Sequence, residues 1–197
     1  MTKGEKTRQK IVEEAAALFN QSGFSGFSMS ELMKATGLEK GGIYRHFESK
    51  EQLAAEAFEH AWREALHTRT HDLDKVSNTV DWLKQLIDNF VHRRPSVPGG
   101  CPLLNTAIDA DDGRPLLRRL ALRAMRGWRD ELVEVVERGI ERKEIKRRVD
   151  PKQVADIVIS SLEGALMVSR LEGNRETLST VQSHLDSYLD TEVRLQP

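Results

Sequence analysis

The chain has 197 residues, 30 Lys and Arg against 31 Asp and Glu, a net charge of −1, and 39% hydrophobic residues. This composition is ordinary for a globular protein and excludes a disordered chain. The single Cys excludes an internal disulfide, and no apolar run approaches the ~20 residues that a membrane helix needs. The N-terminus also lacks the apolar stretch of a signal peptide, so we expect a soluble, cytoplasmic protein that does not contact membranes.

Apolar residues recur with a period of 3.6 along nearly the whole chain, which predicts helices and no sheet. The pattern predicts four helices in the N-terminal part: one ending at Ser22–Gly23, one from Ser28 to Gly37, a short one from Lys40 to Phe47, and one from Ser49 to about His71. Ser28 with Glu31, and Ser49 with Gln52, have the spacing of capping boxes, which is why helices are expected to begin there.

Five more helices are expected in the remaining chain. They run from Asn78 through Phe90, from Pro102 to Ala110, from Pro115 to about Lys143, from Asp150 to about Arg170, and over about 175–193, with a turn at Asp111-Asp112-Gly113. The fold class is therefore all-α with about nine helices.

The second and third helices, separated by a turn that contains Gly37, have the pattern of a helix-turn-helix motif. In such a motif the second helix can lie in the major groove of DNA. Its residues suit that task, because glycines allow close backbone approach and the polar side chains can donate to phosphate or guanine. The predicted DNA-binding residues are Ser28, Lys40, Gly41, Gly42, Tyr44, Arg45, His46 and Lys50. The pattern by itself also fits a helical hairpin with solvated charges.

The identities of the residues distinguish a DNA-binding helix-turn-helix from a helical hairpin. The segments that matter are Thr7 to Ile11, Ala15 to Phe19, Gly23-Phe24, Ser28-Met29, and the run Gly37-Leu38-Glu39-Lys40-Gly41-Gly42-Ile43-Tyr44-Arg45-His46-Phe47-Glu48-Ser49-Lys50-Glu51-Gln52-Leu53. Together they closely resemble the N-terminal DNA-binding domain of TetR-family transcriptional regulators, over about residues 7–53. Many members have Thr or Ser where this chain has Gly42, so any contact there must come from the backbone.

The resemblance implies a bacterial homodimer that represses transcription from a palindromic operator in double-stranded DNA and is released by a small molecule. It divides the chain into a DNA-binding domain, residues 1–53, and a helical effector-binding and dimerisation domain, residues 54–197. Residues 1–53 carry 8 basic and 7 acidic side chains, so we expect a few well-placed phosphate contacts per subunit. The basic residues between 114 and 148 alternate with acidic ones, and we interpret them as a solvated face.

The last two helices look like an association surface, because small residues alternate there with apolar ones. The predicted dimer residues are Ile157, Ser161, Gly164, Ala165, Val168, Val181 and Leu185. The alternative is an ordinary intrachain core. In the resembled family the corresponding helices form a four-helix dimer interface.

An apolar effector pocket is expected among the middle helices, where all three Trp residues occur. Its candidate residues are Trp62, Leu66, Trp82, Phe90, Cys101, Asn105, Trp128 and Met167. For any single one of them, core packing is the favoured alternative. The expected effector is apolar or aromatic.

Two sensing mechanisms remain open as alternatives to this regulator. Cys101 could act as a reactive thiol near a helix start, and His60, His67 and His71 share one helix face with Glu64 and could bind a metal. A helical binding protein whose N-terminal hairpin is not the main site is the other alternative. No catalytic motif stands out, so we expect neither an enzyme nor a cofactor.

Overall fold

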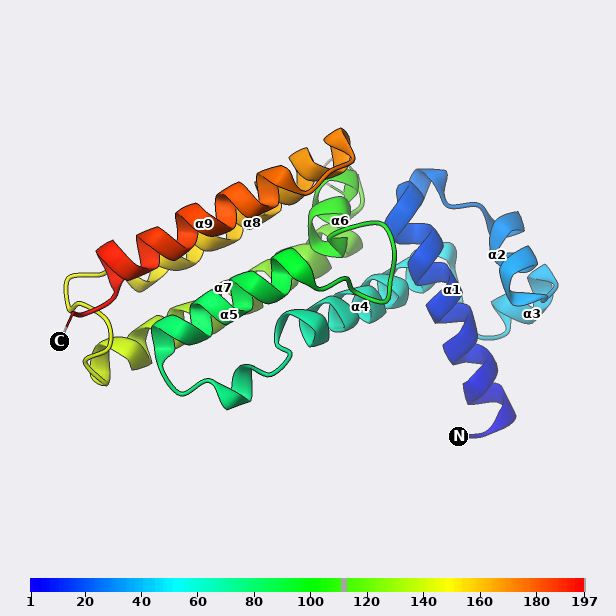
Figure 1. The fold of residues 1–197 in the computed structure, drawn as a ribbon. Coiled ribbons are helices and arrows are strands. Elements are labelled where there is room, and N and C mark those ends of the chain that lie inside the picture. Colours follow the sequence, from blue (N-terminus) through cyan, green and yellow to red (C-terminus); the bar gives the residue numbers. More distant parts are fainter. Residues whose placement is uncertain (111–112, 197) are drawn as a thin grey trace. The chain divides into compact units, whose positions relative to one another are not determined.

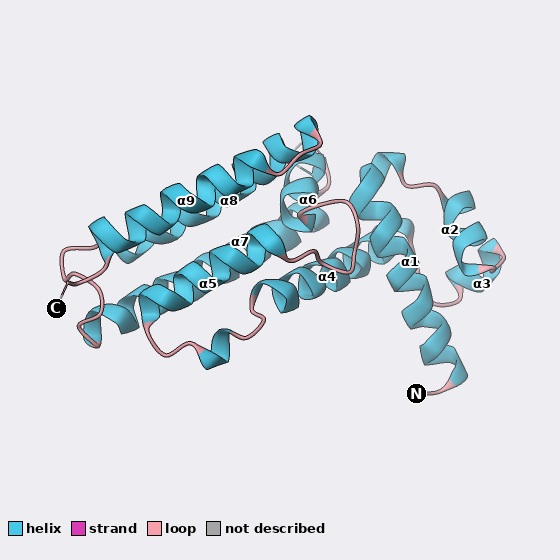
Figure 2. Ribbon diagram, in the orientation of Figure 1, coloured by secondary structure: helices cyan, strands magenta, loops and turns pink. Residues whose placement is uncertain are grey.

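The structure is a computed structural model that describes residues 1–110 and 113–196. Within these ranges it is helical and contains no strand (Figure 2). Nine α-helices are described: α1 (Lys3–Gly26), α2 (Met29–Thr36), α3 (Lys40–Tyr44), α4 (Lys50–Arg69), α5 (Thr79–His92), α6 (Pro102–Ala110), α7 (Pro115–Glu141), α8 (Pro151–Glu172) and α9 (Glu176–Tyr188). The all-α prediction is therefore confirmed. The turn predicted at Asp111-Asp112 lies outside the described residues.

The chain divides into two compact units. Unit 1 comprises Met1–Ala65 and Pro95–Ala124, and unit 2 comprises Leu66–Arg94 and Met125–Pro197. Unit 1 therefore contains α1 to α3, most of α4, α6 and the beginning of α7. The segment 95–124 belongs to the same compact unit as the predicted DNA-binding helices. A division of the chain after residue 53 would instead assign this segment to the second domain.

The local signals at most helix ends act as the sequence predicts. The Asn78 side chain accepts from the amides of Val80 and Asp81 at the start of α5, and Asp150 caps α8 in the same way. Gly37 ends α2 in the left-handed conformation, with a φ of 71°. These ends are correct because each depends only on residues within one helical turn.

The capping box predicted at Ser28 is wrong. The Ser28 side chain makes no capping hydrogen bond; its hydroxyl pairs with the Ser30 hydroxyl at 2.6 Å instead. At the start of α4 the box is half formed: the Ser49 hydroxyl accepts from the Gln52 amide, whereas the Gln52 side chain accepts from the Glu48 amide. The third helix ends at Tyr44, earlier than predicted.

The first helix also extends beyond its predicted end. At Gly23 the backbone leaves the helical conformation (φ 70°, ψ 178°), and a further helical stretch continues to Gly26. The N-terminal residues are helical from Lys3, where Thr2 and Glu5 form a complete capping box. Thus the basic N-terminal segment is part of α1.

Each unit has its own apolar interior. In unit 1 the apolar faces of α1 to α4 close over a cluster that includes Ile11, Phe19 and Ile43, all at most 5% exposed. In unit 2, α8 and α9 run antiparallel and side by side (Figure 1), and both contact α5. No helix in the described ranges is both long and apolar enough to cross a membrane.

Candidate DNA-binding surface

The short helix α3 has one buried face and one exposed face. Ile43 is fully buried and Phe47 is 2% exposed, so the helix is fixed to unit 1 by its apolar side. Lys40, Gly41, Tyr44 and Arg45 are exposed. Tyr44 is 39% exposed. These four of the eight predicted contact residues are therefore brought together on one accessible face.

Two basic residues of α1 hold the helix-turn-helix in place. The Lys10 ammonium donates to the carbonyl of Thr36 at the end of α2, at 2.9 Å. Arg8 forms an ion pair with Glu56 at 2.6 Å, and its guanidinium lies 4.8 Å from the centre of the Phe47 ring. Because both side chains are used within the unit, the basic N-terminal segment supports the motif.

Neither glycine of α3 is required by the packing of the fold. A Cβ added at Gly41 meets nothing within 4 Å, and one added at Gly42 meets only the Leu38 Cβ at 3.8 Å, an ordinary contact. Both residues are helical, so no positive φ demands glycine. The backbone of α3 is consequently bare on its outer side, as a close approach to DNA requires.

Two further predicted residues lie at the margin of this face. His46 is half-buried, with its ring 6.5 Å from that of Phe47. Ser28 is half-buried and its hydroxyl is occupied by Ser30. Lys40 is exposed, with its ammonium 5.9 Å from the Tyr44 ring, so cation and phenol can act together on one phosphate region.

Lys50 differs from the other predicted DNA-binding residues. Its ammonium points into the domain and donates to the carbonyls of Phe24 and Phe27, at 2.8 and 2.9 Å. Burial lowers the pKa of the Lys50 ammonium, the positive charge of Arg114 lowers it further, and Asp109 opposes the shift. The side chain therefore has an intramolecular partner set that the sequence did not predict.

Comparison with known proteins supports the same assignment as this geometry. Residues 11–57 match the family model "Bacterial regulatory proteins, tetR family", and residues 79–185 match "Tetracyclin repressor-like, C-terminal domain". A TetR transcriptional regulator from Chloroflexus aurantiacus is 43% identical with a TM-score of 0.95, and each chain covers 100% of the other.

The chain belongs to the TetR family. A TetR-family regulator from Cytophaga hutchinsonii is 32% identical, with a TM-score of 0.92 over 100% of this chain and 99% of that one. The transcriptional repressor DhaR of Mycobacterium sp. strain GP1 is 28% identical over 172 residues, which cover 87% of this chain and 86% of DhaR. This TetR-family chain is thus a DNA-binding transcriptional regulator, in a family that consists of regulators and not of enzymes.

The predicted effector residues of this TetR-family regulator are divided between the two units. Trp62, Cys101 and Asn105 lie in unit 1, whereas the other five lie in unit 2. The Asn105 amide is already used, because it donates to the carbonyls of Asn20 and Gly99. Met167 is 46% exposed. Of the eight, the structure brings Phe90 and Trp128 into a stacked pair with ring centres 6.3 Å apart.

Next to this aromatic pair lies a buried ion pair that sequence analysis missed. The Arg69 guanidinium is 4.7 Å from the Phe90 ring and 4.4 Å from the Trp128 ring. Its partner is the Glu163 carboxylate at 3.4 Å, and the two side chains are 7% and 11% exposed. Four helices, α4, α5, α7 and α8, contribute to this cluster. A single Arg in a helix carries no local signal that would have identified it.

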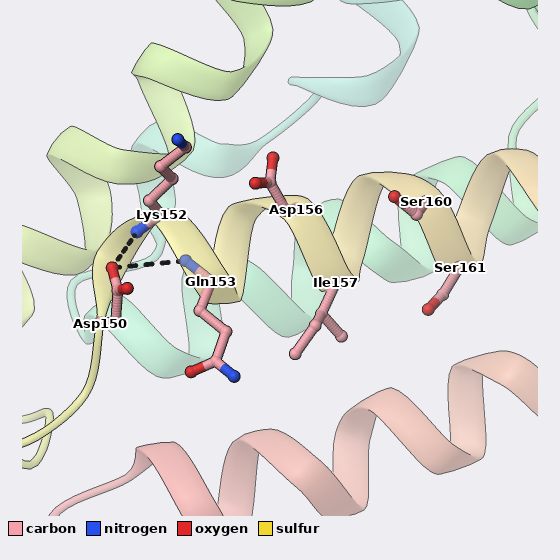
Figure 3. Close-up of a pocket in the computed structure, with 7 residues that line it drawn as sticks. All are labelled: Asp150, Lys152, Gln153, Asp156, Ile157, Ser160 and Ser161. Atoms are coloured by element: carbon pink, nitrogen blue, oxygen red, sulfur yellow. Dashed lines mark hydrogen bonds between the residues drawn. The ribbon is translucent and has the colours of Figure 1, made fainter.

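The predicted dimer residues of the TetR-family chain fall into two groups, one buried and one at least partly exposed. Ala165 and Leu185 are 3% and 0% exposed, so they belong to the intrachain core. The others are half-buried or exposed: Ile157, Ser161, Gly164, Val168 and Val181. Ile157 and Ser161 line a shallow groove on α8 and point to the same side of the helix, whereas Asp156 and Ser160 point to the other (Figure 3).

The residues proposed for thiol or metal sensing do not form a recognisable site. Cys101 is 3% exposed. Within the ranges that the structure describes, no group of three or more His, Cys, Asp or Glu side chains could hold a metal ion. The Glu64 carboxylate accepts from the Ser96 hydroxyl at 2.8 Å, and His71 pairs with Asp72.

Proposed function

We propose that this TetR-family regulator is a homodimeric repressor that reads a palindromic operator with the exposed face of α3 and leaves it when a small molecule binds. The observation that carries the proposal is that face. Lys40, Gly41, Tyr44 and Arg45 are exposed together while Ile43 anchors the same helix. The repressor name of DhaR supports repression over activation. Because its target is chromosomal DNA, we place the protein in the bacterial cytoplasm.

The proposed contacts have distinct roles. Lys40 and Tyr44 donate to phosphates and fix the register, whereas Arg45 contacts a base edge, with guanine as its best partner. Gly41 and Gly42 contribute backbone only, and Ser28 and His46 add contacts at the edge of the surface. We assign DNA binding to residues 1–53 and effector binding and dimerisation to residues 54–197.

A dimer formed through α8 and α9 would explain an otherwise exposed apolar stripe. On α8, Leu171 is 81% exposed and follows Ile157, Ser161, Gly164 and Val168 along one helix face. A two-fold axis there would place two copies of α3 about one DNA turn apart, ~34 Å. Sedimentation equilibrium tests this: Leu171→Glu should give monomers, and Leu195→Glu, also exposed, should remain dimeric. A dimer that survives Leu171→Glu would contradict the interface.

We propose that the effector is a small apolar or aromatic molecule that binds in unit 2 beside Phe90 and Trp128. Aromatic rings supply the apolar surface, and Arg69 and Glu163 supply polar groups that orient a ligand. A variant with Trp62→Phe and Trp82→Phe retains Trp128 as its single Trp. Candidate compounds should change its fluorescence and weaken DNA binding over the same concentration range, whereas a change in only one of these would contradict the assignment.

The experiment that tests DNA reading is selection of bound duplexes from a random library at two salt concentrations. We expect an enriched palindrome whose affinity falls steeply with salt. Binding without sequence preference that disappears at the higher salt concentration would contradict an operator-specific repressor.

Arg45→Ala tests base reading at a single residue. It should relax the preference at one base position in each half-site by ~1–3 kcal/mol and leave the other positions unchanged. The control is Arg147→Ala, an exposed residue in unit 2, which should change neither preference nor affinity. A uniform loss of affinity over all sequences would show that Arg45 contacts only the backbone.

A further inference from the structure

Helix α1 is broken near its end, and two side chains of α6 fill the break. At Gly23 the backbone has φ 70° and ψ 178°, so the Phe24 amide is turned away from the carbonyl of Asn20, its acceptor in a continuous helix. The Asp109 carboxylate of α6 accepts from that amide at 2.9 Å. The Asn105 side chain, one turn earlier in α6, donates to the Asn20 carbonyl, also at 2.9 Å. Thus α6 supplies a partner for each half of the backbone hydrogen bond that α1 lacks.

The two contacts hold different parts of α1. Asn20 is buried and lies before the break, whereas Phe24 lies after it, in the short stretch to Gly26 that leads into α2. Arg114, just before α7, also contacts this stretch. Its guanidinium donates to the Ser25 hydroxyl at 2.8 Å and lies 4.4 Å from the Phe24 ring centre. The connection from α1 to the helix-turn-helix is therefore held from outside, by residues of the segment 95–124 of the same unit.

The contact of Asp109 is specific for the broken form of α1. In a continuous helix the Phe24 amide would already have an acceptor, and the carboxylate would have no donor there. A charged acceptor forms a stronger hydrogen bond than a neutral one, and a part-buried amide without any acceptor is costly. Asp109 is half-buried, and its Oδ1 would lie 3.2 Å from a Cβ placed on Gly23, so the carboxylate packs directly against the break.

We propose that Asp109 of α6 is a positioning residue for DNA reading. By accepting from the Phe24 amide it fixes the break in α1, and hence the direction in which the chain enters α2 and presents α3. Without this acceptor the stretch after Gly23 samples other directions, and only a fraction of the molecules presents α3 correctly. The inference rests on the proposed operator binding and adds to it a residue outside the segment 1–53.

Operator selectivity tests this role. Asp109→Leu removes the acceptor, whereas Asp109→Asn keeps an oxygen that can accept from the same amide. Asp109→Leu should weaken operator binding by at least about fivefold and affect binding to a random duplex much less, because only base reading requires exact presentation of α3. Asp109→Asn should retain most of the operator affinity. The control is Asp130→Leu, which removes the same charge from an exposed position of α7 and should change neither affinity.

A second measurement uses the wild-type protein and does not depend on a variant folding. Amide hydrogen exchange, resolved by NMR, reports how firmly the Phe24 amide is held. This amide should exchange slowly in the free protein, although it has no acceptor within α1. Operator DNA should slow it further, and a random duplex should slow it less.

The possible outcomes separate this inference from the proposed function. Unchanged operator affinity in Asp109→Leu, or an equal loss for operator and random duplex, would overturn the positioning role. The same holds if Asp109→Asn binds as weakly as Asp109→Leu, or if operator DNA leaves the exchange of the Phe24 amide unchanged. If the wild-type protein itself selects no operator, the proposed function fails instead. A selective loss that Asp109→Asn rescues, with slower exchange at Phe24 on the operator, would support the inference.

Discussion

The exposed face of α3 in unit 1 and the interior of unit 2 place charged side chains in opposite environments. In unit 1, α3 exposes Lys40 and Arg45 and buries Ile43 beneath them. In unit 2, the side chains of Arg69 and Glu163 are only 7% and 11% exposed. An exposed charge is available to a partner that arrives from solution, whereas a buried charge must be compensated inside the protein. The proposed DNA-reading residues therefore lie on the surface of unit 1, whereas the Arg69–Glu163 pair lies in the interior of unit 2.

The largest expected effect comes from breaking the buried pair. Arg69→Met would leave the Glu163 carboxylate buried without its guanidinium partner, which in such cases costs about 3–5 kcal/mol. For a chain of this length that corresponds to a fall of about 6–20 °C in the melting temperature. Thermal unfolding followed by circular dichroism measures it.

An exposed pair on α7 provides the matched control. Arg138 and Glu134 lie 3.9 Å apart, with side chains 52% and 70% exposed. Arg138→Met should change stability by less than about 0.5 kcal/mol, because solvent screens exposed pairs. Arg69→Met combined with Glu163→Gln should cost less than the two single changes added together. If Arg69→Met and Arg138→Met lower the free energy of unfolding by the same amount, burial does not distinguish the two ion pairs and the comparison is wrong.

Two glycines in unit 1 allow a similar comparison between a closely packed position and the surface that we propose binds DNA. Gly99 has a φ of +112°, and a Cβ there would lie 2.6 Å from the Asn20 carbonyl oxygen. Gly99→Ala should therefore cost about 1–3 kcal/mol. Gly41→Ala meets open space in a helix and should stabilise the protein by about 0.5–1 kcal/mol.

Operator affinity distinguishes the two glycines further. The methyl group of Gly41→Ala lies on the face proposed to approach DNA, so this variant should bind more weakly although it is more stable. Gly99→Ala should bind normally at temperatures where it remains folded. Undiminished affinity in Gly41→Ala would mean that the backbone of α3 does not approach DNA closely.

The sequence predicted helix ends wherever the deciding contacts are local. Asn78, Asp150 and Gly37 act within one turn of their own helices, and each lies at an end as predicted. Ser28 shows the limit of this reasoning, because a neighbouring hydroxyl at Ser30 competes for the same side chain. Spacing alone does not reveal such a competitor.

Contacts between distant residues could not be predicted in this way. Arg69 and Glu163 are separated by 94 residues, and Lys50 reaches a carbonyl 26 residues earlier in the chain. The resemblance implies a DNA contact for Lys50 from its residue type and position, and it does not predict the two carbonyls that the side chain reaches in the fold. The exposed face of α3 was predicted from the resemblance of its residues to the TetR family, since the helix-turn-helix pattern alone also fits a helical hairpin.

The smallest expected effect concerns two neighbouring carboxylates of α9 and its C-terminal extension. Burial raises the pKa of Asp186, and the charges of Asp190 and Asp88 add to the rise against the opposing effect of Lys84. A hydrogen bond from Lys84 instead lowers the pKa of Asp190, helped by one from Arg194. Ionisation of Asp186 should therefore destabilise the folded protein, whereas ionisation of Asp190 should stabilise it.

The pH dependence follows from these directions. A raised pKa means that the folded state binds the proton more tightly than the unfolded state does. The protonated Asp186 side chain therefore stabilises the fold fully below its unfolded-state pKa, and this stabilisation is lost as the pH rises through its folded-state pKa. The ionised Asp190 side chain stabilises the fold fully above its unfolded-state pKa, and this stabilisation is lost as the pH falls through its lowered folded-state pKa. At pH 7 Asp186→Asn should raise the melting temperature and Asp190→Asn should lower it, each by about 1–2 °C because solvent screens both groups. Both differences should shrink toward pH 3, and melting curves at several pH values that shift in the same direction for both variants would refute the assignment.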